Sequence, residues 1–243
     1  MEKLHALLIA FLITALIAGN YLFFTDAGVS RERVNIERVL DGDTVELTDG
    51  RHIRLTNINT PEKKLAYSEL AKNYLIEFAD ENVELEDLGV DKYGRTLGRL
   101  YSGDEYINLE IVRQGFAHSY IVFDGEEREF SKAEEKARNS KSGIWELSPY
   151  AECVSININK YDEYVEIRDS CGVDFAGWTL KDESTKMYRF SQDAGDEFIL
   201  YSGKGEDTGE KLYWGKGKVW NDDKDRIFIR DSDGKLVFYD SYS

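Results

Sequence analysis

The chain has 243 residues, which is enough for one or two domains with cores of ordinary size. Its net charge of −16 excludes the broad basic surface that usually drives affinity for DNA. The acidic excess lies in both halves: residues 31–150 hold 17 basic and 25 acidic residues, and residues 151–243 hold 13 and 20. Any nucleic-acid contact must therefore be local, through a few arginines and a bound cation.

The first segment of the chain is apolar. Residues 4–24 contain no Asp, Glu, Lys or Arg, and a run of this length can span a bilayer. A cleaved signal peptide has a shorter apolar core and a small-x-small cleavage site, of which residues 15–19 offer only a poor version. We favour a membrane anchor with a tether over residues 1–30, and a cleaved leader is the alternative.

Two signals disagree about the side of the membrane on which the body of the protein lies. Lys3 precedes the apolar span and three arginines follow it within residues 31–38, so the positive-inside rule alone favours a cytoplasmic body. The two cysteines, Cys153 and Cys171, favour the other side, because an even count behind an apolar leader suggests a disulfide in an oxidising compartment. Two free thiols are the alternative. We expect an extracytoplasmic body, or a secreted protein if the leader is cleaved.

Residues 31–150 have the pattern of a small β-barrel that carries helices. Hydrophobic and polar residues alternate over residues 44–55, and Asp49-Gly50 interrupts them with a dipeptide that favours a tight hairpin turn. In the second strand of this hairpin, Arg54 points away from the face that buries its hydrophobic neighbours.

Helices and further strands follow in the same unit. The apolar spacing predicts a helix at about residues 65–80 and a shorter helix that ends at Gly115, with strands between them. Ser131 and Glu134 fit a capping box, which predicts that another helix begins there.

From about residue 153 the pattern changes to strands only. Short alternating runs separated by turn residues predict an antiparallel β-sandwich. Pro149 lies near the join, so we expect a second domain over residues 151–243. Its Trp178 and Trp220 are most simply core residues.

Three short motifs in the first domain contain residues suited to catalysis. They are Asp41-Gly42-Asp43-Thr44, then Ile53-Arg54-Leu55 continuing to Asn59-Thr60-Pro61-Glu62, and then Asp91-Lys92-Tyr93-Gly94-Arg95. Each motif alone is typical of a turn, a helix start or a solvated strand residue. Their occurrence together, in this order, indicates a function.

Phosphodiester cleavage needs the residue types that these motifs supply. A carboxylate such as Glu62 can accept the proton of an attacking water. Two arginines can face the negative charge of the transition state with forked hydrogen bonds. A divalent cation can neutralise the same charge, and oxygen ligands from Asp43, Asn59 and the Thr60 carbonyl would suit Ca²⁺.

The combined motifs resemble those of the staphylococcal nuclease (thermonuclease-like) family. The resemblance covers roughly residues 33–147 and includes Val112-Arg113-Gln114-Gly115 and Gly143-Ile144-Trp145. It implies a mainly β OB-fold, a five-stranded barrel with about three helices, and Ca²⁺-dependent endonuclease activity on DNA and RNA. By this resemblance Arg54, Glu62 and Arg95 are catalytic. It assigns metal binding to Asp43, Asn59 and Thr60, and substrate binding to Lys92, Tyr93 and Tyr120.

The chain departs from the family pattern at two places. The family usually has an aspartate where this chain has Asn59, and an uncharged amide should weaken metal binding by about 1–2 kcal/mol. The segment after Glu62 is short, which reduces the loop that would flank a substrate. A catalytically weak or inactive protein that binds nucleic acid or a cell-surface partner is therefore the alternative function, and a structural surface protein is a third.

Residues 152–241 resemble a lamin-tail domain, an immunoglobulin-like sandwich. The matching pieces are residues 163–167, 177–182, 212–215, 219–221 and 233–237. The resemblance implies a binding or adhesion module whose partner is unknown. No catalytic set occurs in this half of the chain.

Overall fold

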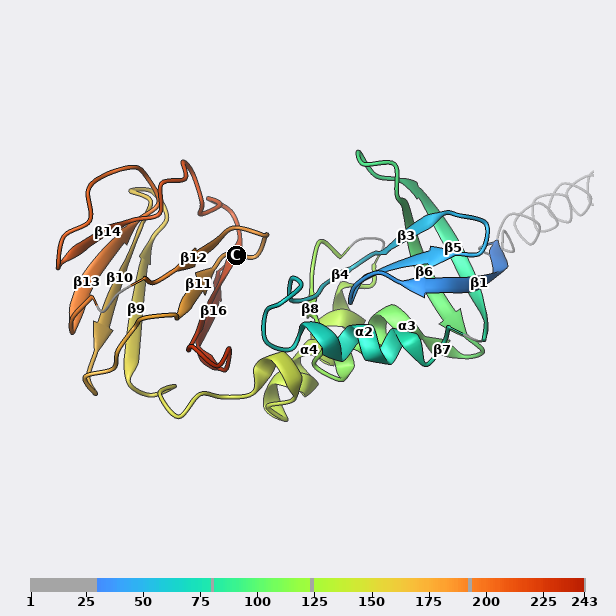
Figure 1. Cartoon of the computed structure of the whole chain (residues 1–243), viewed down its shortest axis with the longest axis horizontal. Helices are drawn as coiled ribbons and strands as arrows, with labels where there is room; N and C mark the ends of the chain where they lie inside the picture. Colours follow the sequence, from blue (N-terminus) through green and yellow to red (C-terminus); the bar gives the residue numbers. More distant parts are fainter. Residues whose placement is uncertain (1–29, 80, 123–124, 192–193, 243) are drawn as a thin grey trace, which may run out of the picture.

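The structure, a computed structural model, describes residues 30–79, 81–122, 125–191 and 194–242. Strands dominate it and form two units that lie side by side (Figure 1). The predicted membrane segment at residues 4–24 lies outside the described residues. Within the described part, every helix is too short or too polar to cross a bilayer.

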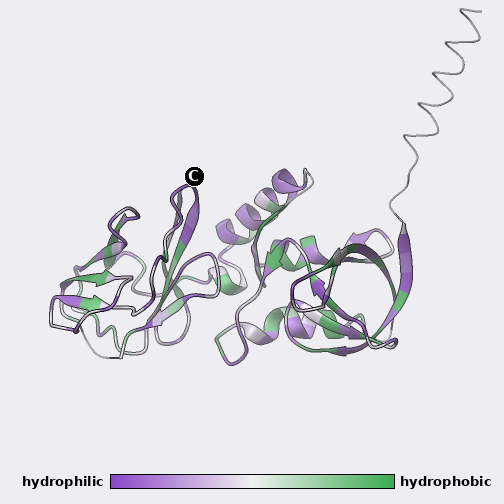
Figure 2. Cartoon of the chain, turned by 90° about the horizontal axis from the view of Figure 1, so that it is seen from above, coloured by the Kyte–Doolittle hydropathy of each residue, from purple (hydrophilic) through white to green (hydrophobic). Residues whose placement is uncertain are grey.

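Five strands close the first unit into a barrel. Their order is β3-β2-β1-β5-β6, and β3 pairs again with β6, so the strands form a ring (Figure 2). Side chains that alternate along these strands point inward and are fully buried, as at Val45, Ile53 and Leu85. The barrel and its helices confirm the predicted mainly β, OB-type architecture. The strands are β1 (Arg31–Val39), β2 (Thr44–Leu47), β3 (His52–Leu55), β5 (Asn82–Val90) and β6 (Thr96–Ser102), with the short β7 (Glu105–Tyr106) beside β6.

Three α-helices and one 3₁₀ turn pack below the barrel (Figure 1). The first is shorter than predicted, because Tyr67 adopts a positive φ of 64° and the helix starts only after it. A two-stranded ribbon of β4 (Ile58–Asn59) and β8 (His118–Ser119) joins the barrel to these helices. The helices are α2 (Ser68–Ile76), α3 (Ile107–Arg113), α4 (Glu127–Asn139) and the turn η1 (Gly143–Trp145).

The predicted capping box at Ser131 and Glu134 is wrong, because α4 begins four residues earlier at Glu127. Tertiary contacts hold the extra turn in helical form: Phe130 is fully buried in the core, and the Glu126 carboxylate accepts a hydrogen bond from Asn57 Nδ2 at 2.6 Å. Glu134 lies in the middle of the helix, and its buried carboxylate accepts hydrogen bonds from Ser119.

Two glycines fix the end of the first unit. Gly115 and Gly143 both have positive φ, and their backbones touch: a Cβ on Gly115 would lie 2.3 Å from the Ser142 carbonyl oxygen, and one on Gly143 would lie 2.2 Å from the Gly115 oxygen. Ile144 N donates to that same Gly115 oxygen at 2.8 Å. Only glycine fits at such a contact, which explains both glycines of the motifs noted in the sequence.

The second unit is a sandwich of two four-stranded sheets, ordered β14-β13-β10-β9 and β12-β11-β15-β16. Trp178 and Trp220 are buried between them. The strands are β9 (Val154–Asn159), β10 (Tyr164–Asp169), β11 (Thr179–Lys181), β12 (Met187–Arg189), β13 (Glu197–Tyr201), β14 (Lys211–Tyr213), β15 (Asp225–Arg230) and β16 (Leu236–Tyr242).

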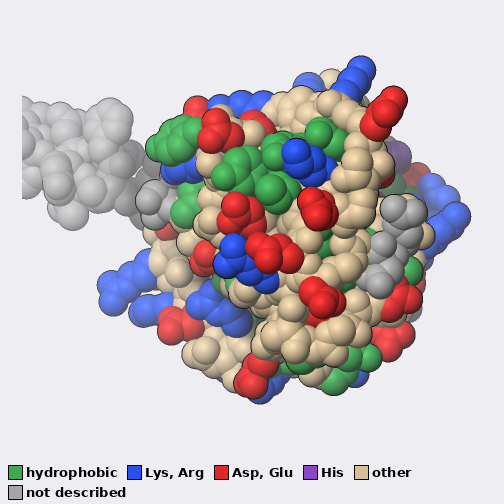
Figure 3. Space-filling model, turned by 90° about the vertical axis from the view of Figure 1, so that its left-hand side faces the viewer, with side chains coloured by type: hydrophobic (Ala, Val, Ile, Leu, Met, Phe, Trp, Pro, Cys, Tyr) green, Lys and Arg blue, Asp and Glu red, His purple; other side chains and the backbone are tan. Residues whose placement is uncertain are grey.

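The sandwich differs from the predicted antiparallel one in a single pair. Strands β13 and β14 run parallel, because residues 202–210 loop back before β14 begins. Cys153 and Cys171 form a disulfide that ties the start of β9 to the turn after β10. The outward end of the sandwich carries acidic and basic side chains interspersed, rather than one basic area (Figure 3).

An aromatic cluster joins the two units. Phe228 on β15 is 3% exposed and packs its ring 5.1 Å from His118, 6.1 Å from Trp145 and 5.2 Å from Tyr239. Trp145 on η1 is fully buried in the same cluster. The end of the first unit therefore completes its core with residues of the second.

A buried ion pair and a short backbone pairing add to this junction. Arg226 Nη1 lies 3.0 Å from Glu134 Oε1 and donates to the Ser119 carbonyl oxygen at 3.0 Å. Glu134 in turn accepts the Ser119 N–H at 2.9 Å. Leu236 N donates to Glu146 O, and Ser148 N donates to Leu236 O, both at 2.8 Å.

We expect Phe228→Ala to destabilise the protein by about 3–5 kcal/mol, because it leaves a cavity in the aromatic cluster between the units. It should also expose the connection at residues 146–153 to chymotrypsin, which can cut at Leu147 and Tyr150. Thermal unfolding and limited digestion measure the two effects. The control is Tyr161→Ala, which removes an aromatic ring that is 78% exposed. Equal melting temperatures for the two variants would contradict the role of this cluster.

Candidate active site

A cavity of about 450 Å³ opens at the rim of the barrel. It gathers residues from the turn before β2, from β3, from the segment after β4 and from the turn before β6. It contains seven of the residues singled out in the sequence: Asp43, Arg54, Asn59, Thr60, Glu62, Arg95 and Tyr120. The cavity brings together segments that are distant in the chain, from Asp41 to Thr185.

Asp43 is fixed by the turn that leads into β2. Its N–H donates to Asp41 Oδ1 at 3.2 Å, and its carboxylate accepts hydrogen bonds from the hydroxyls of Thr44 and Thr60, each at 3.1 Å. Gly42 permits this packing, because a Cβ there would lie 2.9 Å from Thr60 Oγ1. The carboxylate is therefore oriented toward the segment that follows β4.

Arg54 projects from β3 on the side opposite its buried neighbours. Its Nη2 lies 3.1 Å from Asp43 Oδ2 and donates to the Ile58 carbonyl oxygen at 3.0 Å, while its Nη1 donates to the Leu55 carbonyl oxygen. These contacts hold the guanidinium in one orientation before any ligand arrives, which is what electrostatic preorganisation requires.

The carboxyl group of Asp43 is buried beside the Arg54 guanidinium. Burial raises its pKa, and the neighbouring Arg54 charge opposes that rise. A buried carboxyl group with a displaced pKa in a cleft is a typical functional-site feature. Any additional cation beside it would stabilise its charged form further.

Arg95 lies at the same rim because β3 and β6 are paired in parallel, with Arg54 opposite Leu97. Asp91 holds it, with Arg95 Nη2 at 2.7 Å and Nε at 2.9 Å from Asp91 Oδ2. Partial burial acts to raise the pKa of Asp91, but the hydrogen bonds from Arg95 outweigh it and keep the pKa below its usual value. Among the described residues, the polar contacts of the Arg95 guanidinium are made by its Nη2 and Nε atoms.

Two of the predicted substrate-binding residues lie outside the cavity. Tyr93 is 73% exposed on the turn before β6, and its ring lies 5.0 Å from Lys92 Nζ and 5.6 Å from Arg95 Cζ. Neither Tyr93 nor Lys92 lines the cavity. They form an exposed edge next to Arg95.

Glu62 and Tyr120 stand at the mouth of the cavity. Glu62 is exposed in the segment after β4, and no hydrogen bond or ion pair within the described residues engages its carboxylate. Tyr120 follows β8, and its N–H donates to the Asn57 carbonyl oxygen at 2.9 Å. Burial and nearby Glu183 raise the pKa of Tyr120, and Arg54 opposes them.

Three oxygen donors in the cavity are suited to a hard cation. Asp43, Asn59 and Thr60 are all buried and offer a carboxylate, an amide oxygen and a carbonyl, and Ca²⁺ accepts such donors together with water. Among the described residues, no group of three or more His, Cys, Asp or Glu is placed to hold a metal ion. The candidate ligand set therefore has one charged donor, the Asp43 carboxylate, because residue 59 supplies an uncharged amide.

The second unit contributes to the same cavity, which sequence reasoning did not find. Ser184 and Thr185, in the turn between β11 and β12, line it opposite Asp43 and Asp41. No local pattern marks these two residues, because their position results from the junction between the units. Asp41 was visible in the first motif, and its hydrogen bond to the Asp43 N–H explains its presence there.

Comparison with known proteins matches the first unit. Residues 52–147 fit the family model described as staphylococcal nuclease homologue. An uncharacterized endonuclease of Haemophilus influenzae is 34% identical over 138 residues, covering 54% of this chain and 77% of that protein. An uncharacterized endonuclease of Escherichia coli O157:H7 is 36% identical over 115 residues, covering 45% and 74%. A micrococcal nuclease of Shigella flexneri is 31% identical over 130 residues, covering 46% and 73%.

We expect Asn59→Asp to bind Ca²⁺ about 5- to 30-fold more tightly than the native chain. A second carboxylate beside Asp43 would add a charge-assisted contact of about 1–2 kcal/mol. Calorimetric titration with Ca²⁺ measures the change. The matched control is Asn73→Asp, which adds the same charge on an exposed position of α2. An equal gain in both variants would mean that residue 59 is not a ligand.

Proposed function

The chain belongs to the staphylococcal nuclease homologue family, and we propose that it is a Ca²⁺-dependent endonuclease that hydrolyses phosphodiester bonds of DNA or RNA. The observation that carries the proposal is a single cavity lined by two arginines that carboxylates hold in place, by the buried Asp43, and by the exposed Glu62. The family and the names of its relatives support a hydrolytic nuclease. The identity of the metal and the roles of the individual residues are proposed in addition to what the family supports.

Each side chain has a defined task in the proposed reaction. Glu62 accepts a proton from the attacking water, for which its unengaged carboxylate is suited. Arg54 and Arg95 donate hydrogen bonds to the non-bridging oxygens as the water oxygen adds to phosphorus and the negative charge grows. The ester bond from phosphorus to the leaving sugar oxygen then breaks, and the departing alkoxide takes a proton from water. Because Asp43 and Asp91 already fix the two guanidiniums, little reorganisation is needed when the charge develops.

Ca²⁺ would be held by Asp43, Asn59 and the Thr60 carbonyl, and it would supply charge neutralisation for the phosphate and a hard site for water. The Asp43 carboxylate would then contact both the cation and the Arg54 guanidinium. Tyr93 and Lys92, on the exposed edge beside Arg95, would contact the nucleic acid outside the cavity through stacking and charge.

The second unit bears on the domain organisation and the cellular location of the protein. We propose that residues 151–243 are a lamin-tail-like domain, which the two four-stranded sheets and the buried Trp178 and Trp220 support. The Cys153–Cys171 disulfide supports an extracytoplasmic location, because such bonds persist in oxidising compartments. Membrane attachment through residues 4–24 completes the proposal.

A catalytically inactive nucleic-acid-binding protein is the second candidate. The Asp43–Arg54 contact and the amide at Asn59 favour it, because both reduce the negative charge available to a metal. This candidate function predicts that the protein binds a nucleic-acid strand and does not cleave it.

Glu62→Gln should lower kcat on single-stranded DNA by about 10²- to 10⁴-fold, because the amide cannot accept a proton. Arg95→Ala should lower it by about 10²- to 10³-fold through loss of transition-state stabilisation. Glu69→Gln and Arg128→Ala change the same residue types at exposed positions and serve as controls. Cleavage at the native rate by Glu62→Gln would rule out this mechanism.

Removal of divalent cations with a chelator should abolish cleavage, and millimolar Ca²⁺ should restore it. Asp43→Asn should prevent the recovery, because the candidate ligand set of residues 43, 59 and 60 then has no carboxylate. Calorimetry gives a readout that is independent of activity: the native chain should bind Ca²⁺ and Asp43→Asn should not. Cleavage that persists in chelator would contradict the assigned cation.

A further inference from the structure

A second cavity, of about 220 Å³, lies between the two units. The segment that follows β4 forms one wall, and strands β11, β12 and β15 of the sandwich form the other. It shares Thr60, Pro61 and Glu62 with the candidate active site. The two cavities are therefore neighbours on either side of the segment that carries the proposed general base.

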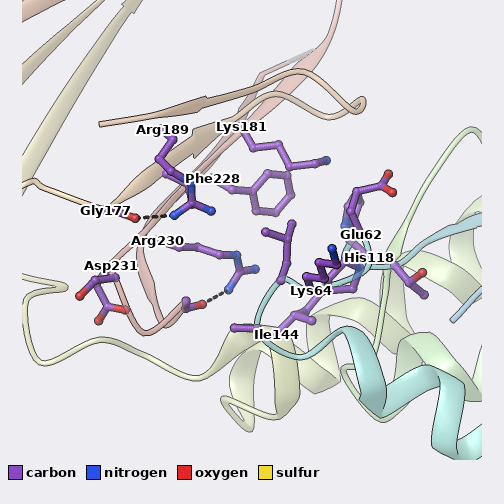
Figure 4. Close-up of a pocket in the computed structure, with 17 residues that line it drawn as sticks. Glu62, Lys64, His118, Ile144, Gly177, Lys181, Arg189, Phe228, Arg230 and Asp231 are labelled. Carbon is purple, nitrogen blue, oxygen red and sulfur yellow. Dashed lines mark hydrogen bonds between the residues drawn. The ribbon is translucent and has the colours of Figure 1, made fainter. Parts of the chain in front are cut away.

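The interdomain cavity is cationic in a chain of strongly acidic composition. Lys181 and Arg230 project from the sandwich toward the opposite segment, which contributes Lys64, while Arg189 at the edge donates to the Gly177 carbonyl oxygen of its own unit (Figure 4). The carboxylates in the lining are Glu62 and Asp231, so four cations face two acids. Against a net charge of −16 for the whole chain, this local excess needs an explanation.

The two central cations have no acidic partner within salt-bridge distance among the described residues. Lys181 Nζ donates to the Asp182 carbonyl oxygen at 3.3 Å, and Arg230 Nη1 donates to the Gly234 carbonyl oxygen at 3.1 Å. The Asp231 carboxylate is directed away and accepts the N–H groups of its own turn (Figure 4). Among the described residues, the hydrogen bonds of Lys181 and Arg230 thus go to carbonyl oxygens, and nearby carboxylates act on the two cations only from beyond salt-bridge distance.

Desolvation makes this arrangement costly without an anion. It lowers the pKa of Lys181 to about 8 and that of Arg230 to about 10. Partly buried cations are normally compensated by a partner charge. An anionic ligand that enters the cavity would supply that charge.

The rest of the lining limits what the anion can be. Phe228, Ile144 and Leu65 give the cavity an apolar floor beside its cations. A cavity of about 220 Å³ has room for a phosphate group with part of its sugar. A phosphate carried on a nucleoside matches both the charge and the apolar surface.

We infer that the interdomain cavity is a phosphate subsite for the nucleic-acid strand, in which Lys181 and Arg230 of the sandwich bind a phosphodiester group near the scissile one. The strand passes from the active site over the segment of Glu62 and Lys64. This inference rests on the proposed nuclease function, and it assigns the second unit a direct part in holding the substrate.

Strand binding without metal tests the subsite separately from catalysis. The probe is a fluorescein-labelled 12-nucleotide single-stranded DNA, titrated with the purified full chain in a non-ionic detergent and chelator. Lys181→Gln/Arg230→Gln should bind it about tenfold more weakly or worse. The slope of log affinity against log salt should fall by about 0.7 for the one phosphate lost.

Matched controls separate this effect from net charge and from misfolding. Lys204→Gln/Lys216→Gln removes the same charge at exposed positions of the sandwich and should stay within twofold of the native chain. Lys181→Arg keeps the cation and should retain affinity. Lys64→Gln, on the exposed loop, should weaken binding about threefold. Equal affinities for the subsite and control variants would overturn the inference.

Cleavage kinetics distinguish the subsite from the nuclease function itself. A dinucleotide carries only the scissile phosphate, so the subsite variant should process it at the native kcat/KM, while its KM for the 12-mer rises about tenfold. If the native chain and the subsite variant both cleave DNA and bind the 12-mer equally well, the subsite inference is wrong and the nuclease function stands. If 12-mer binding depends on Lys181 but neither the native chain nor any variant cleaves DNA, the nuclease function is wrong and the subsite stands. If inorganic phosphate stabilises the native chain while strand affinity is the same in the variant, the cavity holds free phosphate and the inference fails.

Discussion

The parallel pairing of β3 with β6 is the constraint on which the rest of the site depends. It closes the barrel, and its register puts Arg54 opposite Leu97, two residues beyond Arg95. Without that closure, the motifs near residues 41–62 and 91–95 would lie on separate edges of an open sheet. Because a closed barrel leaves no free edge there, the two arginines share one rim and face the same cavity.

The barrel, its helices and most of the site residues were predictable because they depend on local patterns. Strand alternation gave the orientation of Arg54, and the ordered motifs identified Asp43, Glu62 and Arg95 as a group. Other features were not predictable, because they depend on contacts between distant segments. Helix α4 begins before its apparent cap because Phe130 and Glu126 gain tertiary partners. Ser184 and Thr185 reach the cavity through the junction between the units, where Phe228 packs on Trp145 and Arg226 pairs with Glu134.

The acidic composition and a polyanionic substrate are compatible because the relevant cations sit in cavities. A wall of low dielectric constant strengthens the field of a few charges in a cleft, whereas exposed charges are screened within about 10 Å at ordinary salt. The sandwich adds walls beside the segment that carries Glu62. Its β11–β12 turn lines the candidate active site, and residues of β11 and β15 line the interdomain cavity.

The ribbon of β4 and β8 ties the state of one unit to the state of the other. Asn59 pairs with His118 across this ribbon, and the adjoining Ser119 is bonded to Arg226 of the sandwich. A ligand that displaced Arg226 would remove the hydrogen bonds that the sandwich makes to this ribbon. Linkage between binding sites is reciprocal, so any effect of such a ligand on cation affinity would be matched by an equal effect of the cation on the affinity for that ligand.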